Sequence, residues 1–217
     1  MGMQQRLNGW TTAQGFDLIE TMRFDALDGF VELERHLGRM KTSAEELGFA
    51  FNRHDCRNDL QAATFRLTSD ARIRLMLSPS GAVAIEVRPL PEKPDGPVNV
   101  AIVPLPVAAD DPRLRHKTSD RGFLDEARIA AGTFEVIFVR EDGRVTEGSF
   151  TNIFVPRDGG LVTPRSGSLM PGILRERMLE SGEAIEGDVR VEDLDGRFYI
   201  GNSLRGLLPA KRAAVHN

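Results

Sequence analysis

Cysteine is nearly absent from this sequence of 217 residues, and its one cysteine, Cys56, has no partner for an internal disulfide or a CxxC metal site. No apolar run approaches the ~20 residues that a membrane-spanning helix needs. The first ten residues, MGMQQRLNGW, lack the hydrophobic stretch of a secretory signal. The histidines show no metal-binding spacing. These absences predict a cytoplasmic protein with no membrane segment and no metal site.

Common nucleotide-binding and hydrolase motifs are missing as well. The sequence has no GxxxxGKS or GxxxxGKT phosphate loop, no GxGxxG and no GxSxG. The net charge of -4 argues against a nucleic-acid-binding protein, which normally carries a basic face. Lysine is scarce, and arginine, which stays protonated, cannot replace it as an amine nucleophile. Lysine chemistry therefore has four candidates, which are Lys41, Lys93, Lys117 and Lys211.

The first half of the chain alternates between helix and strand patterns. Apolar residues recur at helical spacing over 31–48, and Gly48 is a plausible C-cap. Residues 72–77 and 82–88, joined by SPSG, have the alternation of a β-hairpin. The proline-rich segment 89–97 is expected to be irregular, and 98–106 returns as a strand.

The second half contains more strands than helices. Asp120 is a candidate cap for a helix over 121–131, and 133–139 and 149–155 are expected to be strands. A further helix is expected over 171–181, with Pro171 in its first turn. Near the C-terminus we expect a short strand and then a turn. Because single helices interrupt runs of strands, the pattern predicts an α+β protein. We place its two domains at 1–105 and 106–217.

Four short motifs carry residues suited to one kind of chemistry: RHKTSDR (115–121), TEGSFTNIF (146–154), LMPGILRE (169–176) and GNSLRG (201–206). A pyridoxal phosphate enzyme needs a lysine whose pKa is lowered, and the basic neighbours of Lys117 would lower it. It also needs a carboxylate at the pyridine nitrogen, for which Glu147 is a candidate. The spacing alone leaves simpler interpretations open, namely a solvated basic turn at Lys117 and a surface glutamate at Glu147.

The cofactor's phosphate requires hydrogen-bond donors and positive charge. A helix that begins near 170–174 offers free amides, and Gly172 permits close approach of the backbone. Asn202 and Ser203 could add donors, and Arg39 could add a fork-shaped cation. Arg39 lies beside the apolar stripe of its helix, so an ordinary solvated arginine is the alternative there.

Together with LIETMRF (18–24) and LERHLGRM (33–40), these ordered motifs resemble the class IV aminotransferase family, the fold-type IV pyridoxal phosphate enzymes. The resemblance spans most of the chain. It implies two α+β domains with the cofactor in the interdomain cleft, and a homodimer. It also implies that Lys117 forms the Schiff base and that Glu147 contacts the pyridine nitrogen. The implied phosphate ligands are Arg39, the backbone at Ile173 and Leu174, and Ser203, and Gly172 and Asn202 are further candidates for binding the cofactor.

Within the family, the residues after the lysine favour one activity. Many aminotransferases have a tyrosine where this chain has Gly122, and Arg121 resembles the pattern of 4-amino-4-deoxychorismate lyase. We therefore expect a lyase that forms 4-aminobenzoate, for folate biosynthesis, and pyruvate. Arg23, Arg74 and Arg121 are candidates for binding the carboxylates of this small amino substrate. The alternatives are a branched-chain or D-amino-acid aminotransferase and a non-catalytic cofactor-binding protein.

Overall fold

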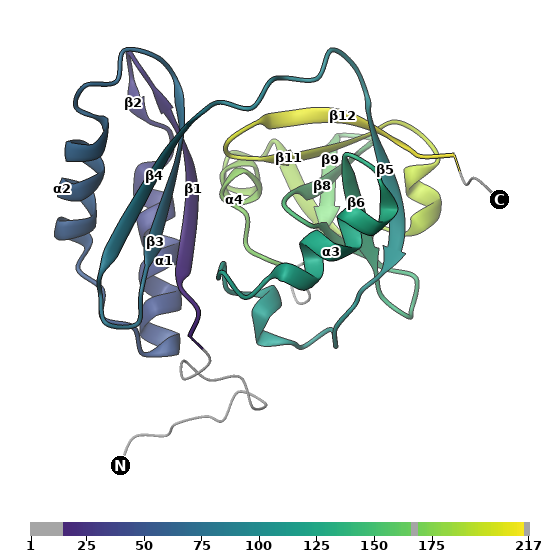
Figure 1. Ribbon diagram of the computed structural model, residues 1–217. Coiled ribbons are helices and arrows are strands. Elements are labelled where there is room, and N and C mark those ends of the chain that lie inside the picture. The colour runs from purple at the N-terminus through teal and green to yellow at the C-terminus, as the bar shows by residue number, and fades with distance from the viewer. Residues whose placement is uncertain (1–14, 166–168, 215–217) are drawn as a thin grey trace. The chain divides into compact units, whose positions relative to one another are not determined.

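The computed structural model describes residues 15–165 and 169–214, and the chain in it divides into two compact units (Figure 1). The first unit ends at Leu90 but also includes 116–120. The second unit contains 91–115 and the chain from Arg121 onward. The sequence places the domain boundary between residues 105 and 106. In the structure the first unit ends at Leu90, and the chain returns to it only for residues 116–120. The first ten residues, considered above as a possible signal, lie outside the described ranges.

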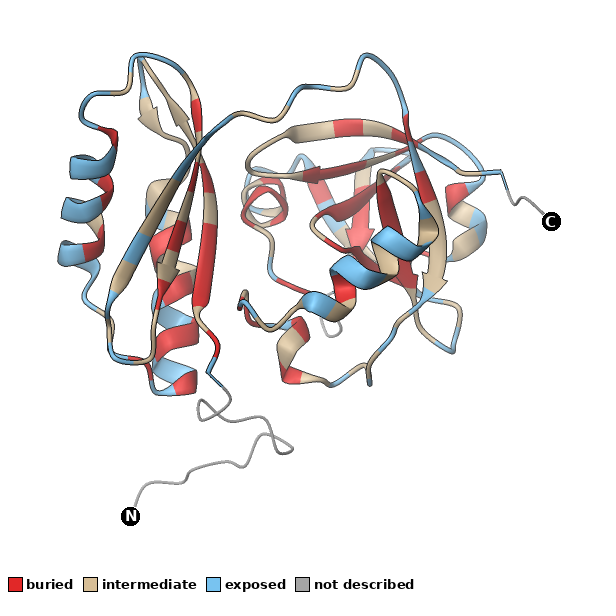
Figure 2. Cartoon of the chain, viewed as in Figure 1, coloured by how far each residue is buried: buried red, intermediate tan, exposed pale blue. Residues whose placement is uncertain are grey.

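The first unit is an antiparallel sheet covered on one face by two helices. The sheet order is β2-β1-β3-β4. Its strands are β1 (Leu18–Asp25), β2 (Gly29–Phe30), β3 (Ala71–Leu77) and β4 (Val83–Pro89), and its helices are α1 (Leu33–Leu47) and α2 (Arg53–Thr64). Alternate residues of β3 are buried, and Leu18 and Met22 of β1 join them in the core with the helices, so every second residue of these strands lies on the opposite face. Figure 2 shows the buried stretches of this sheet and of the helices.

The helix expected over 31–48 is confirmed as α1. Its buried residues include Leu37, Met40 and Ala44, and Gly48 ends it in the left-handed conformation at φ 74°. The hairpin of β3 and β4 is also confirmed. The sequence patterns missed α2, which begins where the side chain of Asn52 accepts hydrogen bonds from two backbone amides. Only three of its residues are buried, so its apolar periodicity is weak.

The second unit is built on one mixed sheet with the order β10-β9-β8-β11-β12-β5-β6-β7. The strands are β5 (Val98–Pro104), β6 (Glu135–Val139), β7 (Val145–Gly148), β8 (Asn152–Arg157), β9 (Gly160–Pro164), β10 (Ala184–Gly187), β11 (Phe198–Asn202) and β12 (Gly206–Arg212). The helices are α3 (Gly122–Ala131) and α4 (Ile173–Glu180), with 3-10 turns η2 (Pro112–Leu114) and η3 (Val191–Leu194). Together the two units confirm the expected α+β class.

Three expectations for the second half are wrong in detail. Asp120 does not cap α3, because α3 begins at Gly122 after Arg121, and Asp120 belongs to the segment grouped with the first unit. Pro171 lies before α4 rather than in its first turn, since Gly172 is the N-cap. The C-terminal segment forms two antiparallel strands, β11 and β12, rather than a strand followed by a turn.

Of the helices in the described part of the chain, none combines the length and the apolar composition that a transmembrane helix requires.

Candidate active site

Lys117 lies in a short segment that pairs with the beginning of β1. The amide of Ile19 donates to the carbonyl of Lys117 at 2.8 Å, and the amide of Ser119 donates to the carbonyl of Asp17 at 2.9 Å. Leu18 lies opposite Thr118 in this antiparallel pairing, and Thr118 is fully buried. The backbone of Lys117 is therefore held within the first unit, and the alternative of a loose, solvated basic turn does not hold.

The residues on both sides of Lys117 point to the helix-covered face of the sheet. His116 is buried, with Nδ1 at 3.1 Å from Oγ of Ser43 and Nε2 at 3.5 Å from a carboxylate oxygen of Glu46, both on α1. Thr118 is buried on the same face. Because side chains alternate along an extended segment, Lys117 lies on the other face of the sheet, beside Ile19.

Two of the arginines suggested for substrate carboxylates also lie on that other face, but their surroundings differ. Arg23 pairs with Asp70 at 2.6 Å and lies 3.7 Å from Asp25, so its charge is already compensated. Arg74 lies opposite Thr21 in the register and makes no ion pair within 4 Å among the described residues, while the buried Nε of both arginines lacks a hydrogen-bond partner there. Arg74 is therefore the better candidate for binding an anionic substrate near Lys117.

Arg39 is held by a buried carboxylate. Its Nε and Nη2 donate to the two oxygens of Glu20 at 2.8 and 2.6 Å, and Nδ1 of His36 lies 2.7 Å from Oε2 of Glu20. Burial alone would raise the pKa of Glu20, but the charges and hydrogen bonds of Arg39 and His36 outweigh burial and lower this pKa to about 2. Glu20 is thus a carboxylate at any working pH. The alternative of an ordinary solvated arginine does not describe Arg39.

In the second unit, Glu147 lies on β7, where its side chain is buried rather than at the surface. Its Oε1 accepts a hydrogen bond from the amide of Met170 at 2.9 Å, two residues before the N-cap of α4. The second and third motifs, which are more than twenty residues apart in the sequence, therefore meet at this carboxylate. The alternative of a surface glutamate is wrong, because Glu147 is only 5% exposed.

Glu135, which the sequence patterns did not identify, holds the loop that follows Glu147. Its Oε1 accepts from the amide and hydroxyl of Ser149 at 2.9 and 2.6 Å, and its Oε2 accepts from the amide of Phe150 and the hydroxyl of Thr151 at 3.1 and 2.9 Å. Burial raises the pKa of Glu135 above its ordinary value although these hydrogen bonds oppose the shift. The available signal was a glutamate within the apolar strand TFEVIFV.

The N-terminus of α4 has the form expected of an anion site. No side chain among the described residues caps it, and its first residues, Ile173 and Leu174, are buried. A Cβ at Gly172 would collide with Oδ1 of Asn152, so any other residue there would require the buried side chain of Asn152 to move. The side chain of Leu174 packs with Phe154, so this residue can contribute its amide alone. The free amides and the lack of a side chain at Gly172 suit a phosphate.

Arg121 and Asn202 tie these segments together. Nη2 of Arg121 donates to the carbonyl of Ser149 at 2.7 Å, and Nη1 lies 3.9 Å from the sulfur of Met170. Nδ2 of Asn202 donates to the carbonyl of Phe150 at 3.1 Å, while Oδ1 accepts from the amides after Ser203 at 3.1 and 2.9 Å. Both side chains shape the backbone around Glu147 and the turn that contains Ser203.

Comparisons with known proteins identify this arrangement. A family model described as amino-transferase class IV matches residues 17–213. The chain belongs to the class IV aminotransferase family. Its cofactor is therefore pyridoxal phosphate. In the second unit, the buried carboxylate of Glu147 and the amides at the start of α4 are groups that suit this cofactor. In the first unit, Lys117 and Arg39 are residue types that suit it. A comparison with curated proteins found no match.

Three solved structures resemble at least 91% of the chain. A protein from Mesorhizobium loti, provisionally described as an amino-acid aminotransferase, shares 36% identity at a TM-score of 0.85, over 91% of this chain and 100% of that one. A protein provisionally described as a 4-amino-4-deoxychorismate lyase shares 26% identity at a TM-score of 0.76, over 92% and 85%. A protein from Thermotoga maritima, provisionally described as a branched-chain aminotransferase, shares 25% identity at a TM-score of 0.81, over 100% and 83%.

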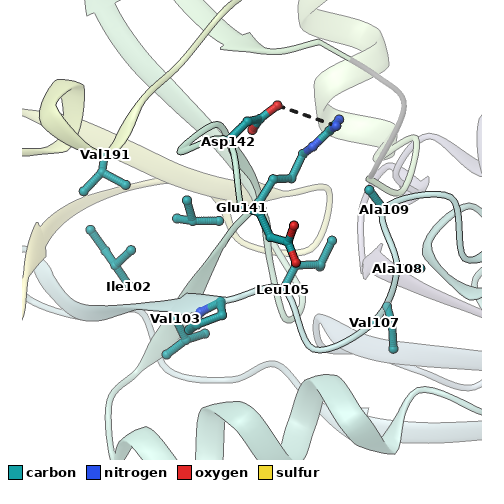
Figure 3. A pocket seen from close by; sticks show the side chains of 12 residues that line it. Ile102, Val103, Leu105, Val107, Ala108, Ala109, Glu141, Asp142 and Val191 are labelled. Carbon is teal, nitrogen blue, oxygen red and sulfur yellow. Dashed lines mark ion pairs between the residues drawn. The ribbon is translucent and has the colours of Figure 1, made fainter.

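The second unit contains a pocket of about 820 Å³ (Figure 3). Its walls are mainly apolar, with Ile102, Val103 and Leu105 among them, and Arg140 and Asp142 form an ion pair of 3.6 Å beside it. None of the residues expected to bind cofactor or substrate lines this pocket. Within the described ranges there is also no cluster of His, Cys, Asp and Glu that could hold a metal ion.

Proposed function

We propose that this class IV enzyme is a lyase that converts 4-amino-4-deoxychorismate into 4-aminobenzoate and pyruvate, with Lys117 as the lysine that binds the cofactor covalently. The observation that carries the cofactor-dependent activity is the buried Glu147, fixed by the amide that precedes α4. A buried carboxylate such as that of Glu147 can accept a hydrogen bond from the pyridine nitrogen and keep this nitrogen protonated. When bound, pyridoxal phosphate supplies an electron sink for the carbon that loses its proton.

In this proposal, each protein group has a defined task. The amine of Lys117 removes the proton from the ring carbon that carries the substrate's amino group. The enolpyruvyl group then leaves, takes up a proton and becomes pyruvate, and the ring becomes aromatic. Lys117 lies on the same sheet face as Arg74, whose guanidinium is suited to a substrate carboxylate. Arg39, the amides of Ile173 and Leu174, and Ser203 are the proposed phosphate ligands.

The lyase is favoured by Gly122 and Arg121, which follow Lys117, and by the relative at 26% identity that is described as a lyase. An aminotransferase is the second candidate, because the relative at 36% identity is described as an amino-acid aminotransferase. An aminotransferase would use the same lysine and glutamate. The homodimer, the cytoplasmic location and the place in folate biosynthesis belong to the lyase proposal.

The two candidates are separated by their products. Purified holoenzyme is incubated with 4-amino-4-deoxychorismate and, separately, with pairs of amino acids and 2-oxo acids. Pyruvate and 4-aminobenzoate from the first mixture, without amino transfer in the second, would support the lyase. Amino transfer without 4-aminobenzoate would make the chain an aminotransferase. A holoenzyme that is inactive in both assays would favour a non-catalytic cofactor-binding protein.

A further inference from the structure

A buried acid on β1 has no task in the chemistry described so far. Glu20 is 1% exposed and lies on the helix-covered face of the sheet in the first unit. Removing a carboxylate from water is costly unless it is paired and hydrogen-bonded. A buried ion pair also adds little to stability compared with well-packed apolar side chains. Core packing alone therefore does not explain an acid at this position.

The contacts of Glu20 fix the plane of one guanidinium group. Two parallel hydrogen bonds, at 2.8 and 2.6 Å, join Arg39 to both oxygens of Glu20. His36 contacts the same carboxylate at 2.7 Å from one turn earlier in α1. Such a fork-shaped contact restricts rotation of the guanidinium. The side chain of Arg39 is 12% exposed, whereas those of Glu20 and His36 are 1% exposed, so Arg39 is held from the buried side.

The same strand also holds the lysine. Ile19, the residue before Glu20, donates its amide to the carbonyl of Lys117 at 2.8 Å. Consecutive residues of β1 thus fix the backbone of Lys117 and the side chain of Arg39. All of these contacts lie within the first unit.

We infer that Glu20 and His36 are positioning residues, which hold the guanidinium of Arg39 in the orientation that binds the phosphate of the cofactor. The inference rests on the proposed function, because it takes Arg39 as a phosphate ligand. Glu20 and His36 do not touch the cofactor in this account. They act through Arg39 alone, and they therefore affect binding of the phosphate and not of the aldehyde.

The test compares two aldehydes that differ only in the phosphate. Full-length protein freed of cofactor is titrated with pyridoxal phosphate and with pyridoxal, and binding is followed by absorbance. Groups that orient a ligand-binding side chain typically contribute about 10–100-fold to affinity at metal sites. We therefore expect Glu20→Gln to lower the affinity for pyridoxal phosphate by at least about tenfold. Its affinity for pyridoxal should stay that of the wild type. Glu45→Gln, on the exposed side of α1, should leave both affinities unchanged.

Two further variants keep the test decisive. Arg39→Gln should lose the preference for pyridoxal phosphate over pyridoxal, and adding Glu20→Gln to it should cause no further loss. His36→Gln removes one contact of the carboxylate and should show a smaller loss of preference. It replaces Glu20→Gln in the comparison if that variant does not fold, as judged by circular dichroism.

The possible failures are distinguishable. If Arg39→Gln keeps the wild-type preference, the proposed phosphate role of Arg39 is wrong. If Arg39→Gln loses the preference while folded Glu20→Gln and His36→Gln keep it, the positioning role is overturned and the phosphate role stands. If Glu20→Gln lowers the affinities for pyridoxal phosphate and for pyridoxal equally, the inference is also overturned, because this result would indicate a general structural effect.

Discussion

At the scale of single residues, the direction of the pKa shift of a buried carboxylate depends on its partners more than on how deeply it is buried. Glu20 and Glu135 are both buried, yet their pKa values shift in opposite directions. Glu20 accepts hydrogen bonds from the cation Arg39, whereas the described donors to Glu135 are backbone amides and hydroxyls. Burial favours the neutral acid, and at Glu20 the charges and hydrogen bonds of Arg39 and His36 reverse that preference.

The lowered pKa of Glu20 predicts a pH-dependent contribution to stability. An acid whose pKa is lower in the folded state stabilises the fold above its unfolded pKa, near 4.5, and loses this contribution as the pH falls toward about 2. Glu20→Gln should therefore lower the free energy of unfolding by a constant amount above about pH 5, and the difference from the wild type should shrink in acid. Urea unfolding of both proteins at a series of pH values measures this difference in the free energy of unfolding. A difference that grows in acid would contradict the assignment.

Glu135 should behave as a support for the loop after Glu147. Glu135→Gln keeps the size of the side chain but turns one of its two acceptor oxygens into an amide donor, so the amide of either Ser149 or Phe150 loses its acceptor. Leaving a buried donor unsatisfied costs about 1–3 kcal/mol, and we expect a loss of stability in this range. Hydrogen exchange at the amide of Ser149 or of Phe150 should become faster. Unchanged exchange at these two amides would show that Glu135 does not hold the loop.

At the scale of secondary-structure elements, the start of α4 depends on the absence of a side chain. A methyl group at Gly172 would collide with the side chain of Asn152, which also contacts the carbonyl of Met170. Gly172→Ala should therefore shift the first turn of α4 and weaken binding of pyridoxal phosphate. Titration of the cofactor and thermal unfolding measure both effects.

Gly38 provides the matched control. It lies within α1, and a methyl group there would contact nothing within 4 Å. Alanine is favoured over glycine in a helix by roughly 0.5–1 kcal/mol, so Gly38→Ala should raise stability slightly without changing cofactor affinity. If Gly172→Ala binds the cofactor as tightly as Gly38→Ala does, the start of α4 does not hold the phosphate.

Elements with strong periodicity could be predicted from the sequence, and those defined by distant partners could not. α1 and the hairpin of β3 and β4 follow their apolar patterns closely. α2 exposes most of its surface and was missed. Asp120 resembled a helix cap, but its segment pairs with β1, about a hundred residues earlier in the chain, and no local pattern reports such pairing.

At the scale of the whole molecule, the resemblance of ordered motifs to a known family carried more information than any single residue. Lys117 alone was compatible with a basic turn, and Glu147 alone with a surface position. The structure shows instead that the backbone of Lys117 is held by β1 and that Glu147 is buried. The roles of Glu20 and Glu135 could not be inferred in advance, because each depends on partners from other parts of its unit.

The central claim is that Lys117 binds the cofactor covalently, and chemical trapping tests it most directly. Wild-type protein loaded with pyridoxal phosphate is reduced with borohydride, digested and mapped by mass spectrometry. We predict one reduced cofactor on Lys117, no label at this position in Lys117→Ala, and normal labelling of Lys117 in Lys93→Ala, which changes an exposed lysine. Label on another lysine of the wild-type protein, or no label at all, would contradict the account.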